Sequence, residues 1–351
     1  MDPQQIDNEQ QGLDNNNPNV VQPQPDVRRN RAAFGRRYRD FNLVGSGGFG
    51  EVYEARDTAV VEGRTHVAIK EFRTSDRHKL RSFKRELRIL KQMGTDNGFT
   101  VPFLEYHDNP QNRKKSFLVL GLMWKTLHYV VWHKAEFPEF EESFSLRKFL
   151  EGLDIIHADL KPANIMFAND TLEHLRIIDF GFAFKRTNYN DHSLPKAEYS
   201  AMEVFLKLGS YTNAIDIWSF GCILVFMYCA KHLFTTTTDD REKKIVYEIV
   251  RTLGMPPRDM ITSHVCPTYF KYEDGQWKRD IGWCEWLVEP RSLNIEQFLL
   301  LNSKQQPGDD QQEYDWYVDL IKRIVKYDVN TRINIAGILD HDFLKAGPPL
   351  L

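Results

Sequence analysis

The feature that most constrains this fold is a glycine-rich run that lies between two strand-like segments. Gly45-Ser-Gly47-Gly-Phe-Gly50 follows the apolar segment Phe41–Val44 and precedes the segment Glu51–Ala55. Because glycine has no Cβ, backbone N–H groups in such a run can come close to phosphate oxygens. A dinucleotide-binding loop would open a helix, whereas here a strand follows. The run therefore predicts a β-hairpin whose turn covers phosphate groups.

Strand-like and helix-like patterns fall in different parts of the chain. Further strands are predicted at three segments, His66–Lys70, Phe103–Tyr106 and Phe117–Leu122. Residues 75–90 place apolar side chains at helical spacing, and Ser75 or Asp76 could cap this helix. Beyond residue 140 the pattern is mainly helical. Strands first and helices later predict an α+β protein with two lobes.

The bulk composition excludes several classes of protein. The chain has 351 residues and a net charge of −3, so it has no overall attraction for nucleic acid or anionic membrane. The longest apolar stretch, Ile217–Ala230, is too short to span a bilayer and predicts a buried core helix. The polar start, Met1-Asp-Pro-Gln-Gln, does not match a secretory signal. Four cysteines without a C-x-x-C pair favour a reducing compartment, either cytoplasm or nucleus.

Residues 1–38 differ from the rest of the chain. They are rich in Gln, Asn, Asp and Pro and have few large apolar side chains, so we expect a disordered tail. An arginine cluster lies at its end: Arg28, Arg29, Arg31, Arg36, Arg37 and Arg39. This cluster is either a nuclear-import or phosphate-binding patch or simply a solvated segment that leads into the fold.

Lys70 stands in an apolar strand, where a lysine usually lies at an exposed edge. Its position after the glycine-rich run favours a role in holding the α- and β-phosphates of a nucleotide. Such a lysine needs a carboxylate partner from a helix, and Glu86 lies next to the inward stripe of residues 75–90. The alternative is that Glu86 is a surface residue beside Lys84 and Arg88.

Four side chains farther along the chain have the chemistry that phosphoryl transfer needs. That reaction requires a carboxylate that orients the attacking hydroxyl, a cation on the γ-phosphate, and oxygen ligands for Mg²⁺. In the run Ile156-His-Ala-Asp-Leu-Lys-Pro-Ala-Asn164, Asp159, Lys161 and Asn164 supply these groups in that order. Asp179, in Ile-Ile-Asp-Phe-Gly, would be the second Mg²⁺ ligand.

These motifs, in this order, resemble those of eukaryotic protein kinases over about residues 38–344. The resemblance implies a small antiparallel β N-lobe with one main helix and a mainly helical C-lobe. It implies a tail at 1–38, a kinase domain at 39–344 divided near residue 122, and a short tail at 345–351. ATP and Mg²⁺ are the implied cofactors, and proteins are the implied substrates.

The resemblance also implies roles for single residues. The implied catalytic residues are Asp159, Lys161, Lys70 and Glu86, and the metal ligands are Asn164 and Asp179. The implied nucleotide contacts are Val44, Gly45, Ser46, Gly47, Gly48, Phe49, Gly50, Glu51, Val52, Ala68, Lys70, Leu120, Met123 and Met166. Asp216 would brace the catalytic loop, and Glu203 and Arg332 would form a buried pair. Leu90, His157 and Phe180 would form a stack that joins the lobes.

The substrate class follows from the same resemblance. Asp159-Leu-Lys-Pro is similar to the Ser/Thr kinase form of this loop. His157-Ala-Asp and the insert after Thr252-Leu-Gly-Met-Pro-Pro resemble the CMGC group, in particular the homeodomain-interacting and dual-specificity tyrosine-regulated (DYRK) branch. We therefore expect a Ser/Thr kinase of the nucleus or cytoplasm, with direct nucleic-acid binding and membrane association disfavoured.

Several positions depart from the family pattern. Ala158 replaces an Arg that grips a phosphorylated activation loop, and Met202 replaces the Pro of Ala-Pro-Glu. Lys196 stands where a Ser or Thr would bond the catalytic Asp. The activation segment, 179–203, lacks a centred Tyr-x-Tyr motif, since Asp191 and Ser193 fall near those positions and Tyr189 is offset. We expect no tyrosine switch there, and proline-directed specificity is doubtful because Ser200 replaces an Arg.

The largest departure lies before His157. A full-length helix is expected there, and residues 144–156 are short of one by about three turns. Together with the altered activation segment, this leaves an alternative to an active kinase: a pseudokinase that binds nucleotide or partners with little turnover.

Overall fold

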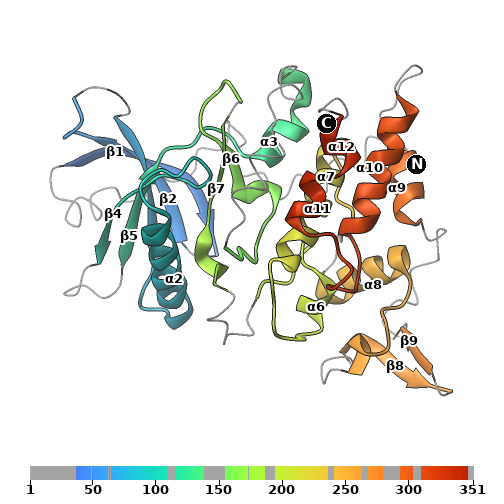
Figure 1. Cartoon of the computed structure of the whole chain (residues 1–351). Coiled ribbons are helices and arrows are strands. Elements are labelled where there is room, and N and C mark those ends of the chain that lie inside the picture. Colours follow the sequence, from blue (N-terminus) through green and yellow to red (C-terminus); the bar gives the residue numbers. More distant parts are fainter. Residues whose placement is uncertain are drawn as a thin grey trace, which may run out of the picture.

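The computed structural model describes residues 37–48, 50–61, 63, 65–108, 115–137, 155–172, 174–185, 194–235, 241–262, 268–274, 276–279, 293–302 and 310–346. Within these residues a β-rich lobe lies beside a mainly helical lobe (Figure 1). The prediction of a two-lobed α+β fold is therefore confirmed.

The first lobe is built on an antiparallel sheet of five strands. Its strands are β1 (Tyr38–Gly47), β2 (Gly50–Asp57), β3 (His66–Phe72), β4 (Phe103–Asp108) and β5 (Ser116–Gly121), in the order β1-β2-β3-β5-β4. Each predicted strand is present, and β1 and β2 are longer than the apolar patterns suggest. Register pairing places Gly47 opposite Gly50, so the glycine-rich run forms the turn of a hairpin.

Helix α2 (Arg77–Met93) packs against this sheet. Asp76 caps its start, because its carboxylate accepts hydrogen bonds from the backbone N–H groups of His78 and Lys79. The ring of Phe83 lies 5.3 Å from the ring of Phe72 on β3. Of the two predicted caps, Asp76 is thus the one that forms.

The second lobe is mainly helical. Its helices are α3 (Leu127–Trp132), α6 (Met202–Phe205), α7 (Ala214–Cys229), α8 (Arg241–Leu253), α9 (Ile295–Asn302), α10 (Gln311–Ile324), α11 (Ile335–Leu339) and α12 (Asp342–Lys345). Short 3₁₀ turns are η3 (Lys134–Glu136), η4 (Pro162–Asn164), η5 (Phe180–Phe182) and η7 (Met260–Thr262). Two small hairpins pair β6 (Ile165–Phe167) with β7 (Leu175–Ile177), and β8 (Phe270–Glu273) with β9 (Gln276–Arg279).

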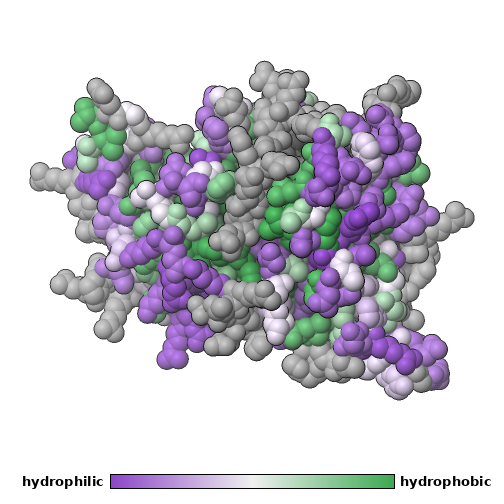
Figure 2. Space-filling view, viewed as in Figure 1, coloured by the Kyte–Doolittle hydropathy of each residue, from purple (hydrophilic) through white to green (hydrophobic). Residues whose placement is uncertain are grey.

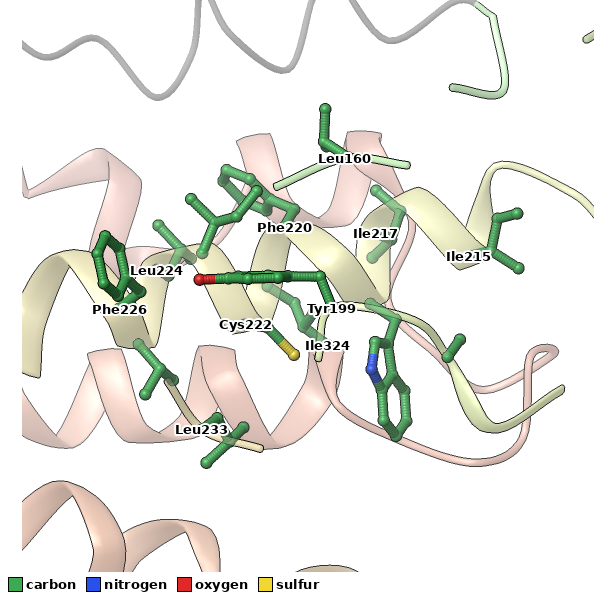
Figure 3. Packing of buried hydrophobic residues seen from close by; sticks show 14 of the residues in the cluster. Leu160, Tyr199, Ile215, Ile217, Phe220, Cys222, Leu224, Phe226, Leu233 and Ile324 are labelled. Carbon is green, nitrogen blue, oxygen red and sulfur yellow. The ribbon is translucent and has the colours of Figure 1, made fainter. Parts of the chain in front are cut away.

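Helix α7 forms the centre of this lobe. Every residue from Ile215 to Cys229 is buried, as the uniformly apolar sequence predicts for a core helix. Figure 3 shows Tyr199, Leu233 and Leu160 around its side chains. A Cβ at Gly221 would lie 2.4 Å from Ile324 on α10, so glycine permits these two helices to approach closely. Among the described residues, no helix is both long and apolar enough to cross a membrane.

Candidate active site

An ammonium group shared between two carboxylates lies where the two lobes meet. Lys70, on β3, donates hydrogen bonds to both oxygens of Glu86 on α2, at 3.0 and 2.8 Å. The same Nζ atom lies 2.8 Å from Oδ1 of Asp179, which precedes η5. The alternative of a surface Glu86 is wrong, because its side chain is completely buried.

Burial and charge compete in this cluster. Burial alone would lower the pKa of Lys70, but the carboxylates of Asp179 and Glu86 raise it above its ordinary value. Burial raises the pKa of Glu86 to about 7, against the attraction of Lys70. For Asp179, burial acts upward, yet Lys70 holds its pKa below the ordinary value. One cation thus pairs with two carboxylates. The ionised form is better stabilised at Asp179, which is partly exposed, than at the buried Glu86.

The second cluster lies on the loop before β6. Lys161 Nζ lies 3.0 and 3.3 Å from the two oxygens of Asp159. Asn164 donates from Nδ2 to the backbone oxygen of Asp159 at 2.8 Å and to its Oδ2 at 3.1 Å. Burial raises the pKa of Asp159 above its ordinary value, and Lys161 acts in the opposite direction. The structure thus brings all three predicted side chains together.

A buried carboxylate supports the backbone of this loop. Asp216, in the first turn of α7, accepts hydrogen bonds from the N–H groups of His157 and Ala158, at 2.6 and 2.9 Å. Ala158 has φ 63°, a left-handed conformation that costs energy for a residue with a Cβ. The His157 ring lies 2.9 Å from the backbone oxygen of Ile178, next to Asp179. Asp216 therefore occupies the bracing position that the resemblance implies.

The glycine-rich hairpin lies beside the Lys70 strand. Gly50 needs to be glycine for packing, since a Cβ there would lie 1.8 Å from the backbone oxygen of Glu71. At Gly47 and Gly48 a Cβ would meet no protein atom within 4 Å. Glycine at these two positions is therefore not required by packing within the described residues. Phe49 lies outside the described residues, and the hairpin positions 44–46 and 51 lie on β1 and β2.

Predicted apolar contacts of the nucleotide come from both lobes. Ala68 on β3 pairs with Leu120 on β5, and Val52 on β2 pairs with Lys70. Met166 on β6 bridges to Thr126, just before α3. Met123 is buried, as is Leu120, whereas Val52, Ala68 and Met166 are partly exposed.

Two contacts that the sequence did not reveal tie α2 to the second lobe. Arg85 donates a hydrogen bond to the backbone oxygen of Gly181 at 3.2 Å. The backbone N–H of Phe180 bonds Glu86. Phe180 also packs edge-on against His157, with ring centroids 5.1 Å apart, as the predicted stack requires. No sequence signal marks Arg85, because its partner is a backbone atom 96 residues away.

The end of the activation segment is fixed to the second lobe. Arg332 donates to both oxygens of Glu203, at 2.7 and 3.1 Å, and both side chains are buried, as expected. Lys196 bonds Glu242 on α8 at 2.9 Å and the hydroxyl of Tyr269 at 3.0 Å. Lys196 thus anchors this segment to α8. The family pattern has a Ser or Thr at this position, and that hydroxyl would bond the catalytic carboxylate instead.

Some predictions fall outside the described residues. These are the shortened helix, apart from residues 155 and 156, the activation-segment residues Tyr189, Asp191 and Ser193, and most of the tail. Of the arginine cluster, Arg37 and Arg39 are described. Arg37 bonds Asp57 at 2.7 Å and Glu105 at 3.1 Å, so this arginine serves the fold.

Comparison with known proteins matches the protein kinase domain to residues 38–344. The chain is 32% identical over 240 residues to mitogen-activated protein kinase p38a of Drosophila melanogaster, covering 64% of this chain and 62% of that protein. It is 31% identical over 283 residues to human mitogen-activated protein kinase 12, covering 76% and 74%. It is 26% identical over 335 residues to the human dual specificity protein kinase CLK4, covering 88% and 66%.

Proposed function

This chain belongs to the protein kinase family, and from that premise we propose that it transfers the γ-phosphoryl group of ATP to Ser or Thr hydroxyls of proteins. The observation that carries the proposal is the meeting of two clusters at the junction of the lobes. One is Lys70 with Glu86 and Asp179, and the other is Asp159 with Lys161 and Asn164.

Each cluster has a distinct task in this reaction. Lys70, held by Glu86, would bind the α- and β-phosphates. Asp159 would orient the substrate hydroxyl and accept its proton, and its raised pKa makes it a better base than an exposed carboxylate. Lys161 would stabilise the charge on the γ-phosphoryl group in the transition state. The contact between Lys161 and Asp159 holds each side chain in place before the substrate binds.

The polar groups present fit Mg²⁺. This ion prefers carboxylate and carbonyl oxygens, and it neutralises phosphate charge during phosphoryl transfer. Asn164 commits its Nδ2 to the backbone oxygen of Asp159, which leaves its Oδ1 as an acceptor. Asp179 uses Oδ1 for Lys70. We propose that the remaining oxygens of Asn164 and Asp179 hold the ion.

The nucleotide would lie between the glycine-rich hairpin and the second lobe. Val52, Ala68 and Met166 present partly exposed apolar atoms for the base, whereas Leu120 and Met123 are buried. The open space at Gly47 and Gly48 suits the close approach of phosphate oxygens to backbone N–H groups.

Substrate class and family branch are proposed from sequence motifs and relatives. The Asp159-Leu-Lys-Pro run and the mitogen-activated relatives support Ser/Thr transfer. Relatives from the mitogen-activated and CLK kinases support membership of the CMGC group. The homeodomain-interacting and DYRK branch is our narrower proposal, based on the His157-Ala-Asp run. Action in the nucleus or cytoplasm is likewise a proposal.

The test is transfer of radiolabel from γ-labelled ATP to a mixed peptide library in Mg²⁺, followed by phosphoamino-acid analysis. We expect label on Ser and Thr, and a loss of at least a hundredfold in rate for Asp159→Asn. Asp170→Asn is the matched control, because Asp170 is exposed on the turn after β6.

The same experiment separates kinase from pseudokinase. Lys196, bonded to α8 instead of the catalytic loop, is the observation that favours the pseudokinase. No transfer by a folded wild-type protein that still gains thermal stability on addition of ATP would establish that alternative. Label found only on Tyr would overturn the Ser/Thr proposal.

A further inference from the structure

Helix α2 concentrates positive charge on a chain whose net charge is −3. Its 17 residues include seven Lys and Arg and a single carboxylate, Glu86, which is buried and bonded to Lys70. The surface over this helix is hydrophilic in Figure 2. Apart from Arg85, which bonds Gly181 on the inner face, and the partly exposed Lys79, these cations are exposed to solvent.

Five of these cations form one line along the helix. They are Arg77, Arg81, Lys84, Arg88 and Lys91, all exposed, and here they are called the α2 stripe. Their spacing alternates between four and three residues, so each lies one turn from the next on the same face. Within the part of the chain that the structure describes, no carboxylate forms an ion pair with any of the five. Lys91 instead lies 3.9 Å from the centre of the Tyr106 ring.

This arrangement is unfavourable for the helix by itself. Like charges three or four residues apart destabilise a helix. The Asp76 carboxylate at the N-cap already meets the helix dipole, so the unfavourable term is the repulsion along the stripe itself. An anion bound along the stripe would relieve this repulsion, which is the reason to expect a partner at this face.

The shape of the charge selects the kind of partner. The stripe is about 21 Å long, from the rise of 1.5 Å per helical residue. Exposed carboxylates, Asp76 and Asp96, lie just beyond its two ends. A long polyanion such as nucleic acid would meet these carboxylates, whereas about six extended residues of polypeptide fit between them. Leu104 and Tyr106 on β4 are exposed beside the Lys91 end and could contact an apolar side chain.

We propose that the α2 stripe is a docking surface for a short acidic segment of a partner polypeptide. Docking would act on the helix whose inner face holds Glu86 and Arg85, the residues that contact Lys70 and Gly181. Binding there stabilises α2 and with it the closed Lys70–Glu86 pair. This surface is separate from the nucleotide site, so its test does not depend on phosphoryl transfer.

The test measures binding of a fluorescein-labelled hexaglutamate peptide to the full chain by anisotropy. The variant Arg81→Gln/Lys84→Gln/Arg88→Gln removes the centre of the stripe. Its matched control, Lys207→Gln/Arg258→Gln/Lys326→Gln, removes three exposed cations of the second lobe. We expect at least tenfold weaker binding for the stripe variant and unchanged binding for the control. Binding should also weaken as salt is raised.

Folding and alternative ligands are checked in the same series. The stripe variant should melt no lower than wild type, because it loses repulsion between like charges. Peptide should slow amide hydrogen exchange within residues 77–93 of wild type and of the control variant, and not of the stripe variant. Equal peptide affinity in all three proteins would overturn the proposal. A single-stranded DNA hexamer or an anionic vesicle that binds the stripe more tightly than the peptide would also overturn it.

Discussion

At the scale of single residues, two carboxylates of the site share one cation, and this sets their pKa values. Lys70 bonds both Glu86 and Asp179. The Glu86 side chain is completely buried, so water does not solvate its negative charge. The pKa of Glu86 is raised to about 7 for this reason, with burial as the main cause. Protonation of Glu86 would weaken its hold on Lys70, which makes this pair sensitive to pH.

The first prediction concerns stability against pH. Between pH 4.5, the ordinary pKa of Glu86, and about 7, the folded chain keeps a proton that the unfolded chain has released. The contribution of Glu86 to stability is thus full below pH 4.5 and is lost as pH rises through 7. We expect the free energy of unfolding of wild type relative to Glu86→Gln to fall by at most about 3 kcal/mol over this range.

Urea denaturation of both proteins at pH 5 and pH 7.5 measures this difference. Other titrating groups, Asp159 among them, are common to both proteins and cancel in the comparison. Parallel curves, with the same difference at both pH values, would show that Glu86 titrates near its ordinary pKa.

The second prediction concerns Asp216, which accepts two backbone hydrogen bonds in a buried position. An Asn side chain has only one oxygen, so it can accept only one of these two hydrogen bonds. Its NH₂ group would face the other backbone N–H, and both are donors. We expect Asp216→Asn to lose about 1–3 kcal/mol of stability, the cost of a buried donor without a partner. Phosphoryl transfer should fall with it, because Asp159 directly follows the braced residues.

Urea denaturation and the rate of peptide phosphorylation measure the two effects. The exposed Asp170→Asn serves as the control and should change neither. An Asp216→Asn protein of wild-type stability would mean that the loop backbone holds its shape without this carboxylate.

At the scale of elements, the glycine-rich hairpin contains one glycine that packing requires and others that packing does not require. Gly50 lies where a Cβ would overlap the backbone of β3, whereas Gly48 has open space. We expect Gly50→Ala to lose about 1–3 kcal/mol of stability through overpacking, and Gly48→Ala to stay within about 0.5 kcal/mol of wild type. Thermal or urea unfolding of both variants measures this. Equal losses would refute the assignment of Gly50 to packing.

The five strands of the first lobe, α2 and α7 were predictable from sequence, whereas the remaining second-lobe elements were predicted only as a mainly helical region and the contacts between elements only in part. Short strand-like runs after the glycine-rich turn indicated β2 and β3, and the uniformly apolar run indicated α7, because these patterns are local. The partner of Glu86 could be inferred from its motif. By contrast, the bond from Arg85 to Gly181 and the anchoring of Lys196 on α8 join segments distant in sequence. Local periodicity carries no information about such pairings, since they depend on how the lobes pack.

At the scale of the whole molecule, one buried ion pair ties the activation segment to the C-terminal helices. Glu203 and Arg332 are 129 residues apart, and Arg332 also donates to the backbone oxygens of Ala214 and Lys326. It therefore connects α6, the start of α7 and the segment after α10.

The last prediction tests that connection. Arg332→Met leaves the Glu203 carboxylate buried without its cation, which should cost about 3–5 kcal/mol. Replacing both partners, Glu203→Leu with Arg332→Met, removes the stranded charge as well as the bond. The double variant should thus be more stable in urea than the sum of the two single losses predicts, and more stable than Arg332→Met alone. Strictly additive losses would show that the two side chains act independently, and that the backbone bonds of Arg332 alone hold this part of the lobe together.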